Sequence, residues 1–169
     1  MASNRHLGRI IALQTLYEDE FRRDCNDLDI SIDDVLKRNI SRYADMVDDR
    51  LFIEELVAGV CDRLVELDAL LQPIAPDWPI ADIARMDRIV LRIGAYELIF
   101  GDGVPPKVVI NEAVELAKAF GGENSSKFVN GVLGTVLRQH EESAQQDAPK
   151  KQPKSSAKKI SKKISGKES

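Results

Sequence analysis

The residues from 105 to 137 constrain the fold most, because they contain two consecutive amphipathic helices joined by a short glycine turn. Apolar side chains recur every three or four residues from Val109 to Phe120 and again from Val129 to Leu137, which is the period of a helix. Gly121 and Gly122 end the first of them, because glycine tolerates the left-handed backbone that follows a helix C-terminus. The pattern predicts an all-α fold.

Similar periodicity predicts helices through most of the remaining chain. Ser31 and Asp34 resemble a capping box, with aspartate in place of glutamate. Three prolines after residue 72 interrupt the pattern and predict a boundary between subdomains of about residues 1–72 and 77–140. Trp78, in that connector, is interpreted as a packing anchor. Helices are expected over residues 4–24, 31–40, 44–71, 79–85 and 87–100.

The sequence contains no recognisable catalytic or metal site. Cys25 and Cys61 are too few and too far apart for a zinc motif, and Cys61 lies in a helical pattern that predicts a core position. There is no glycine-rich phosphate loop and no nucleophile placed near a base. We therefore expect no catalytic residue, metal or cofactor, and a protein that is not an enzyme.

The sequence also gives no sign of a membrane segment. The longest apolar run, residues 89–100, is short and is interrupted by Arg92 and Glu97. The first residues lack the apolar stretch of a signal peptide. A cytoplasmic protein is expected.

Charge divides the chain into an acidic body and a basic tail. Residues 1–149 carry 16 Lys and Arg against 27 Asp and Glu, whereas residues 150–169 carry eight Lys and one Glu. Residues 141–169 have too few large apolar groups to offset the entropy of ordering, so a disordered basic tail is predicted after a helical domain of residues 1–140. The tail could attract RNA without sequence preference, or serve only solubility.

Two helix starts carry groups that suit an anion. Arg5 and Arg9, with His6 beside them, oppose the helix dipole unless an anion is present, although ordinary surface arginines are the alternative. Lys127 points away from the apolar stripe of its helix, and Phe128 lies at the stripe's edge, where it could stack on a base. The alternative is that the serines before them only cap and Phe128 only packs.

Arg92 lies in an apolar helix and must be paired, because burying an uncompensated charge is costly. We expect Arg92 to form a structural ion pair with at least one of Glu97, Glu112 and Glu115. Glu112 is the predicted partner.

Several segments together resemble the NusB family of bacterial transcription antitermination factors. These are V-I-N-E-A-V-E-L-A-K-A-F from Val109, S-S-K-F-V-N-G-V-L from Ser125, L-R-I-G-A-Y-E-L from Leu91, and the pair Leu16-Tyr17. The similarity covers about residues 5 to 139. It implies two small packed three-helix bundles and binding of boxA-type single-stranded RNA together with NusE, a ribosomal protein, in the RNA polymerase antitermination complex.

The resemblance also implies roles for individual residues. The basic run of the family is interrupted here by His6, Leu7 and Gly8, so few phosphate contacts are expected at the N-terminus. A freestanding module related to the RNA-binding domain of ribosomal RNA cytosine methyltransferases, a protein-only helical adaptor, and a homodimer stay open. The expected RNA-binding residues are Arg5, His6, Arg9, Asn124, Lys127 and Phe128, and those expected to meet NusE are Tyr17, Asp87 and Arg88.

Overall fold

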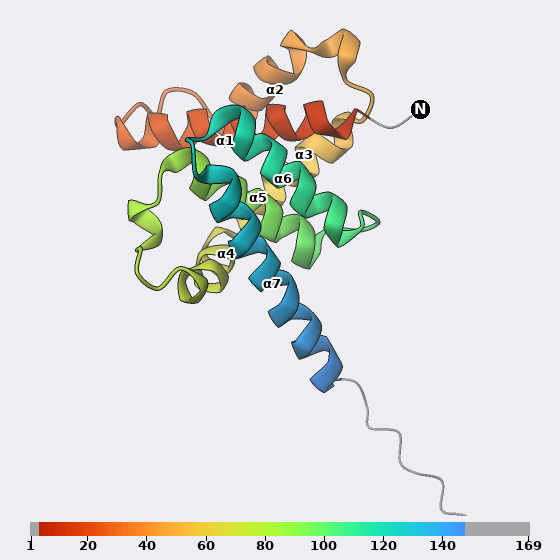
Figure 1. Cartoon of the computed structure of the whole chain (residues 1–169). Coiled ribbons are helices and arrows are strands. Elements are labelled where there is room, and N and C mark those ends of the chain that lie inside the picture. Colours follow the sequence, from red (N-terminus) through yellow and green to blue (C-terminus); the bar gives the residue numbers. More distant parts are fainter. Residues whose placement is uncertain (1–3, 148–169) are drawn as a thin grey trace, which may run out of the picture.

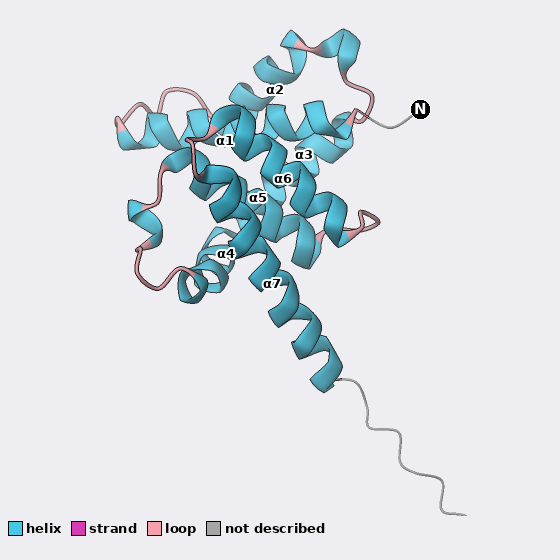
Figure 2. Cartoon of the chain, in the orientation of Figure 1, coloured by secondary structure: helices cyan, strands magenta, loops and turns pink. Residues whose placement is uncertain are grey.

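The computed structural model describes residues 4–147, and within that range the chain forms helices joined by short turns and no strand (Figure 1 and Figure 2). The expected all-α class is confirmed. None of the helices in this range is both long and apolar enough to cross a membrane. The α-helices of the described range are α1 (Arg5–Asp24), α2 (Ile32–Arg42), α3 (Arg50–Asp62), α4 (Leu64–Leu71), α5 (Arg85–Phe100), α6 (Pro106–Phe120) and α7 (Ser125–Asp147).

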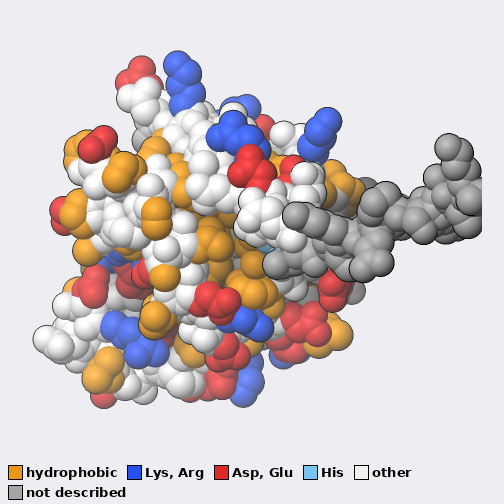
Figure 3. Space-filling model, turned by 90° about the horizontal axis from the view of Figure 1, so that it is seen from below, with side chains coloured by type: hydrophobic (Ala, Val, Ile, Leu, Met, Phe, Trp, Pro, Cys, Tyr) orange, Lys and Arg blue, Asp and Glu red, His pale blue; other side chains and the backbone are white. Residues whose placement is uncertain are grey.

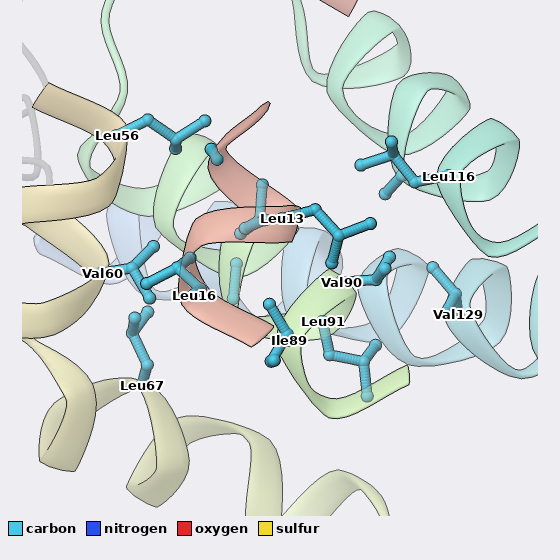
Figure 4. Close-up of a cluster of buried hydrophobic side chains, with 14 of the residues drawn as sticks. Leu13, Leu16, Leu56, Val60, Leu67, Ile89, Val90, Leu91, Leu116 and Val129 are labelled. Carbon is cyan, nitrogen blue, oxygen red and sulfur yellow. The ribbon is translucent and has the colours of Figure 1, made fainter. Parts of the chain in front are cut away.

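The helices form two groups of three that share one apolar core. Helix α1 packs against α2 and α3, while α5, α6 and α7 pack against one another. Figure 4 shows Leu16 of α1 next to Val60 of α3, with Leu116 of α6 and Val129 of α7 in another part of the same cluster. The two three-helix groups match the architecture that the family resemblance implies. The subdomain limits of about 1–72 and 77–140 stay a prediction.

The long helix expected over residues 44–71 is interrupted, which corrects the prediction. The chain leaves the helical conformation at Arg63, where φ is −109° and ψ is 18°. Helix α3 packs on α1 and α5, whereas α4 packs on α5 and α7. Periodicity alone does not reveal this break, because the apolar stripe keeps its helical spacing from Val60 to Leu67.

Side chains cap the starts of α2 and α3. The hydroxyl of Ser31 accepts the amide of Asp34 at 3.2 Å and donates to its carboxylate at 2.8 Å. The predicted capping interaction is therefore confirmed. Asp49 caps α3 by accepting the amide of Phe52 at 3.0 Å.

The connector between α4 and α5 is less helical than expected, because Ile83 and Ala84 leave the helical conformation, with ψ of 134° and 132°. Only Ile80–Asp82 form a short 3-10 turn where a helix over residues 79–85 was predicted. The Gln72 amide oxygen accepts the backbone N–H of Ile80 at 2.9 Å, and its amide nitrogen donates to the carbonyl of Trp78 at 3.0 Å.

Helix α7 continues to Asp147, so residues 141–147 are helical and not part of a disordered tail as expected. The domain limit at residue 140 stays a prediction. Residues 141–147 are Glu, Glu, Ser, Ala, Gln, Gln and Asp, most of which favour a helix even when fully exposed. The low content of apolar residues after residue 140 therefore did not mark the end of the helix. The predicted lysine-rich tail from residue 148 onward lies outside the described residues.

Gly94 lets α5 and α7 approach closely, as its place in an apolar helix predicts. A Cβ atom at Gly94 would lie 2.5 Å from Cδ1 of Leu133. A side chain at this position would therefore displace the buried side chain of Leu133.

Arg92 forms the expected ion pair, but with other partners. Its guanidinium donates to both carboxylate oxygens of Asp68 on α4 at 2.8 Å each, and to Glu20 on α1 at 3.0 Å. The prediction that Arg92 pairs with Glu112 is wrong. Glu97 lies five residues further along α5, about 140° around the helix axis, and both Glu97 and Glu112 face Arg9.

Replacing Arg92 with Ala should lower the free energy of unfolding by about 3 kcal/mol, because Asp68 loses its bidentate partner, whereas Glu20 keeps Arg85 and Arg88. The matched control is Arg50→Ala, which removes an exposed pair with Glu54 and should cost less than about 0.5 kcal/mol. Urea unfolding followed by circular dichroism measures both. Equal effects of the two substitutions would contradict the structural role of Arg92.

Candidate nucleic-acid interface

Arg9, predicted to contact RNA, is buried in an ion pair. Only 3% of the residue is exposed, and its Nε and Nη2 donate to the two carboxylate oxygens of Glu97 at 2.8 and 2.7 Å. Glu112 lies 3.7 Å from Nη1, and the guanidinium lies over the ring of Phe52, 5.2 Å from its centroid. A side chain enclosed in this way does not reach a phosphate, so the prediction for Arg9 is wrong.

Arg5 and His6 stay at the surface, and each has a carboxylate partner. Arg5 donates to Asp49 at 3.1 Å, and its guanidinium lies 4.8 Å from the centroid of the Phe52 ring. Nδ1 of His6 lies 2.6 Å from a carboxylate oxygen of Glu112. Their contacts with RNA stay predictions, and a phosphate at this position has to compete with these carboxylates.

These carboxylates explain why α1 begins with basic residues. Its first turn has no acidic residue, and positive charge there opposes the helix dipole. The anions come instead from neighbouring elements, namely Asp49 before α3, Glu97 on α5 and Glu112 on α6. The negative charge that stabilises the basic residues at this helix start therefore comes from carboxylates of the protein itself.

The start of α7 leaves polar groups available. Ser125 is buried, and its hydroxyl accepts the amide of Gly122 at 2.8 Å, so this serine holds the turn after α6. Asn124 and Lys127 are exposed, and Lys127 has no carboxylate partner within residues 4–147. The hydroxyl of Ser125 thus binds an amide before the helix rather than the first-turn amide that capping would require, while the amide of Asn124 and the ammonium group of Lys127 are available to contact a ligand.

Phe128 and Trp78 separate two adjoining hollows. One hollow, of about 440 Å³, is also lined by Asn124 and Asp87. The other, of about 300 Å³, is also lined by Lys127. Phe128 is half-buried, whereas Trp78 is 61% exposed. The interpretation of Trp78 as a packing anchor is wrong, and its exposure could not be foreseen because periodicity says nothing about a residue in an irregular connector.

The residues expected to meet NusE divide into two kinds. Arg88 is structural, since its Nη1 donates to three backbone carbonyls of the preceding connector at 3.0 to 3.3 Å, and it pairs with Glu20. Tyr17 is half-buried, with the guanidinium of Arg85 5.5 Å from its ring centroid. Asp87 lines the larger hollow, and its Oδ1 is buried without a hydrogen-bond partner.

The two groups of predicted RNA contacts lie at different ends of the molecule. In Figure 1, α1 begins at the right, whereas α7 begins at the left end of α6. Glu112, which holds His6, precedes Gly121 by nine residues, or about 14 Å of helical rise. Figure 3 shows acidic and basic side chains interspersed with hydrophobic ones on the face seen from below, without one large basic patch. A ligand that touches both groups has to follow α6.

The cysteines offer no nucleophile and no metal site. Both are free and exposed, so the predicted core position of Cys61 is wrong. Neighbouring helices still desolvate its thiol, and burial together with nearby Asp19 and Asp62 raises the pKa of Cys61 to about 11. This thiol is protonated at neutral pH. Within the described range, no group of three or more His, Cys, Asp and Glu side chains could hold a metal ion.

Comparison with known proteins gives one consistent family. The model of the NusB family matches residues 6–138. The transcription antitermination protein NusB of Chloroflexus aggregans is 42% identical over 142 residues, which cover 83% of this chain and 91% of that protein. The protein of the same name from Roseiflexus castenholzii is 38% identical over 147 residues, which cover 86% and 99%. These descriptions agree with the expectation that the chain is not an enzyme.

Solved structures agree with the sequence comparison. The structure of T. maritima NusB matches with a TM-score of 0.74 at 30% identity, over 86% of this chain and 99% of that one. A structure of the antitermination factors NusB and NusE in complex with double-stranded RNA matches with a TM-score of 0.71 at 25% identity, over 82% and 99%.

Glu97→Gln should lower the free energy of unfolding by about 3 kcal/mol, because the buried guanidinium of Arg9 loses its bidentate counter-charge and retains only the more distant Glu112, 3.7 Å from Nη1. The double variant Arg9→Met with Glu97→Leu removes both charges and should recover most of that loss. Urea unfolding of the two variants checks this. A double variant as unstable as Glu97→Gln would show that the loss has another origin.

Proposed function

We propose that this chain, which belongs to the NusB family, is a transcription antitermination factor that binds boxA-type single-stranded RNA of ribosomal RNA transcripts together with NusE. In this proposal the complex helps RNA polymerase to read through terminators, and the protein acts in the cytoplasm. The curated relatives are transcription antitermination proteins, and a solved relative is complexed with NusE and RNA. The observation that carries the proposal is the start of α7, where Asn124, Lys127 and Phe128 lie beside two hollows.

Each of these three side chains suits one part of an unpaired nucleotide. The ammonium group of Lys127 can hold a phosphate, the ring of Phe128 can stack on a base, and the amide of Asn124 can hydrogen-bond to a base edge. Stacking of this kind requires a base that is free of its helix, which favours single-stranded RNA. Arg5 and His6 contribute less, because Asp49 and Glu112 already offset their charges.

NusE is proposed to dock beside the RNA, on the surface that carries Tyr17 and Asp87. An acidic body suits a basic ribosomal protein, because opposite charges steer the encounter and favour the correct partner. Asp87 and Asn124 line the same hollow. RNA and NusE would therefore meet over this hollow, and each would complete part of the binding site for the other.

The two alternative functions receive less support. The two relatives that this chain matches over 91% and 99% of their lengths are antitermination proteins, which favours an antitermination factor over a module related to the methyltransferase domain. The comparison with a solved NusB–NusE complex that contains RNA favours an RNA-binding factor over a protein-only adaptor.

Lys127→Ala combined with Phe128→Ala should weaken binding of a boxA-type RNA at least about tenfold, because one phosphate contact and one stack are lost. The matched control is Lys107→Ala with Val108→Ala, which removes an exposed lysine and an exposed apolar residue at the start of α6. Fluorescence anisotropy with labelled RNA, with and without NusE, measures the affinities, and circular dichroism verifies folding. If both double variants bind as the unmodified protein does, the start of α7 is not the RNA site.

A further inference from the structure

Trp78 is exposed on a loop that fixes its position. Its backbone N–H donates to the carbonyl of Ala75 at 3.2 Å, and its carbonyl accepts the side-chain amide of Gln72 at 3.0 Å. Pro76 and Pro79 flank it and restrict the backbone further. With 61% of the residue exposed, the indole ring lies at the surface on a backbone that is hydrogen-bonded on both sides. A large aromatic ring presented in this way is available to a ligand.

The ring shares both of its neighbouring hollows with Phe128. Trp78 and Phe128 are the two residues that line both the hollow of about 440 Å³ and that of about 300 Å³. These volumes fall within or near the lower part of the usual range for small-molecule sites, about 300 to 1,000 Å³. Space for a flat group is therefore present on both sides of this aromatic pair.

The charges around the hollows favour a base over a phosphate. Asp77 lines the smaller hollow, and Asp82 and Asp87 line the larger one. Carboxylates repel phosphate, but they accept hydrogen bonds from the amino groups of bases. Lys127, on the rim of the smaller hollow, can hold the adjoining phosphate outside.

We propose that Trp78 is a second stacking platform for an unpaired RNA base, so that the Trp78–Phe128 pair holds neighbouring nucleotides in the two hollows. The inference rests on the proposed function and deepens it, because it predicts that the RNA must present unstacked bases with amino groups at this point. Stacking on two aromatic rings also gives affinity that depends little on the number of phosphate contacts.

The chain itself contains the reporter for a direct test. Trp78 is its single tryptophan, so a base stacked on the indole should quench the tryptophan fluorescence. We expect the fluorescence to fall during titration of the full chain with boxA-type RNA in the presence of NusE that lacks tryptophan. The midpoint should coincide with that of RNA anisotropy.

Substitutions at position 78 measure the contribution to affinity. Trp78→Ala should weaken RNA binding about five- to 150-fold, the effect of losing one base–aromatic stack. Trp78→Phe keeps an aromatic face and should stay within about threefold of the unmodified protein.

Two glycines of α7 provide a matched pair that leaves Trp78 in place. A Cβ at Gly131 or at Gly134 would meet nothing within 4 Å, so a larger side chain fits at either. Only Gly131 lines the smaller hollow. Gly131→Leu should fill that hollow and weaken RNA binding at least about fivefold, while Gly134→Leu should not change it.

The outcomes separate this inference from the proposed function. RNA binding with unchanged tryptophan fluorescence, and with equal affinity for Trp78→Ala, would overturn the role of Trp78 and leave the function standing. No binding of boxA-type RNA by the folded, unmodified protein with NusE would overturn the proposed function itself.

Discussion

The buried pair between Arg9 and Glu97 fixes the arrangement on which the rest of the structure depends. It joins α1 of the first helix group to α5 of the second, with Glu112 of α6 next to it. Two charges in such a site lose much of their hydration, so the pair adds little net stability compared with apolar residues of the same shape. Its effect is on specificity, because any other packing of α1 would leave a buried charge without a partner. The same pair removes Arg9 from the surface.

In the proposed function, the nucleic-acid surface would therefore lie mainly at the start of α7. The cations at the start of α1 are offset by Asp49, Glu97 and Glu112, whereas Lys127 has no such partner within residues 4–147. The connector before α5 brings Trp78 to the same place. A surface that combines one free ammonium group with aromatic rings binds through stacking more than through phosphate neutralisation. An acidic body can then bind RNA and a basic ribosomal protein side by side.

Sequence patterns predicted the elements of the fold better than the contacts between them. The apolar stripes located α1, α6 and α7, and the spacing of Ser31 and Asp34 located a helix cap, since these features depend on residues close in the chain. The partner of Arg9 is 88 residues away. Periodicity shows which face of a helix is buried, but it does not show which residue of another helix meets that face. For this reason the partners of Arg92, the burial of Arg9 and the exposure of Trp78 could not be predicted.

The central claim is that RNA contacts the start of α7 and the connector before α5, and not the buried cation of α1. Backbone amide NMR spectra of the full chain, recorded during titration with boxA-type RNA, test it most directly. We predict the largest shift changes at residues 122–131 and 76–84, with little change at residues 8–12. The largest changes at residues 5–9, with the start of α7 unaffected, would contradict it.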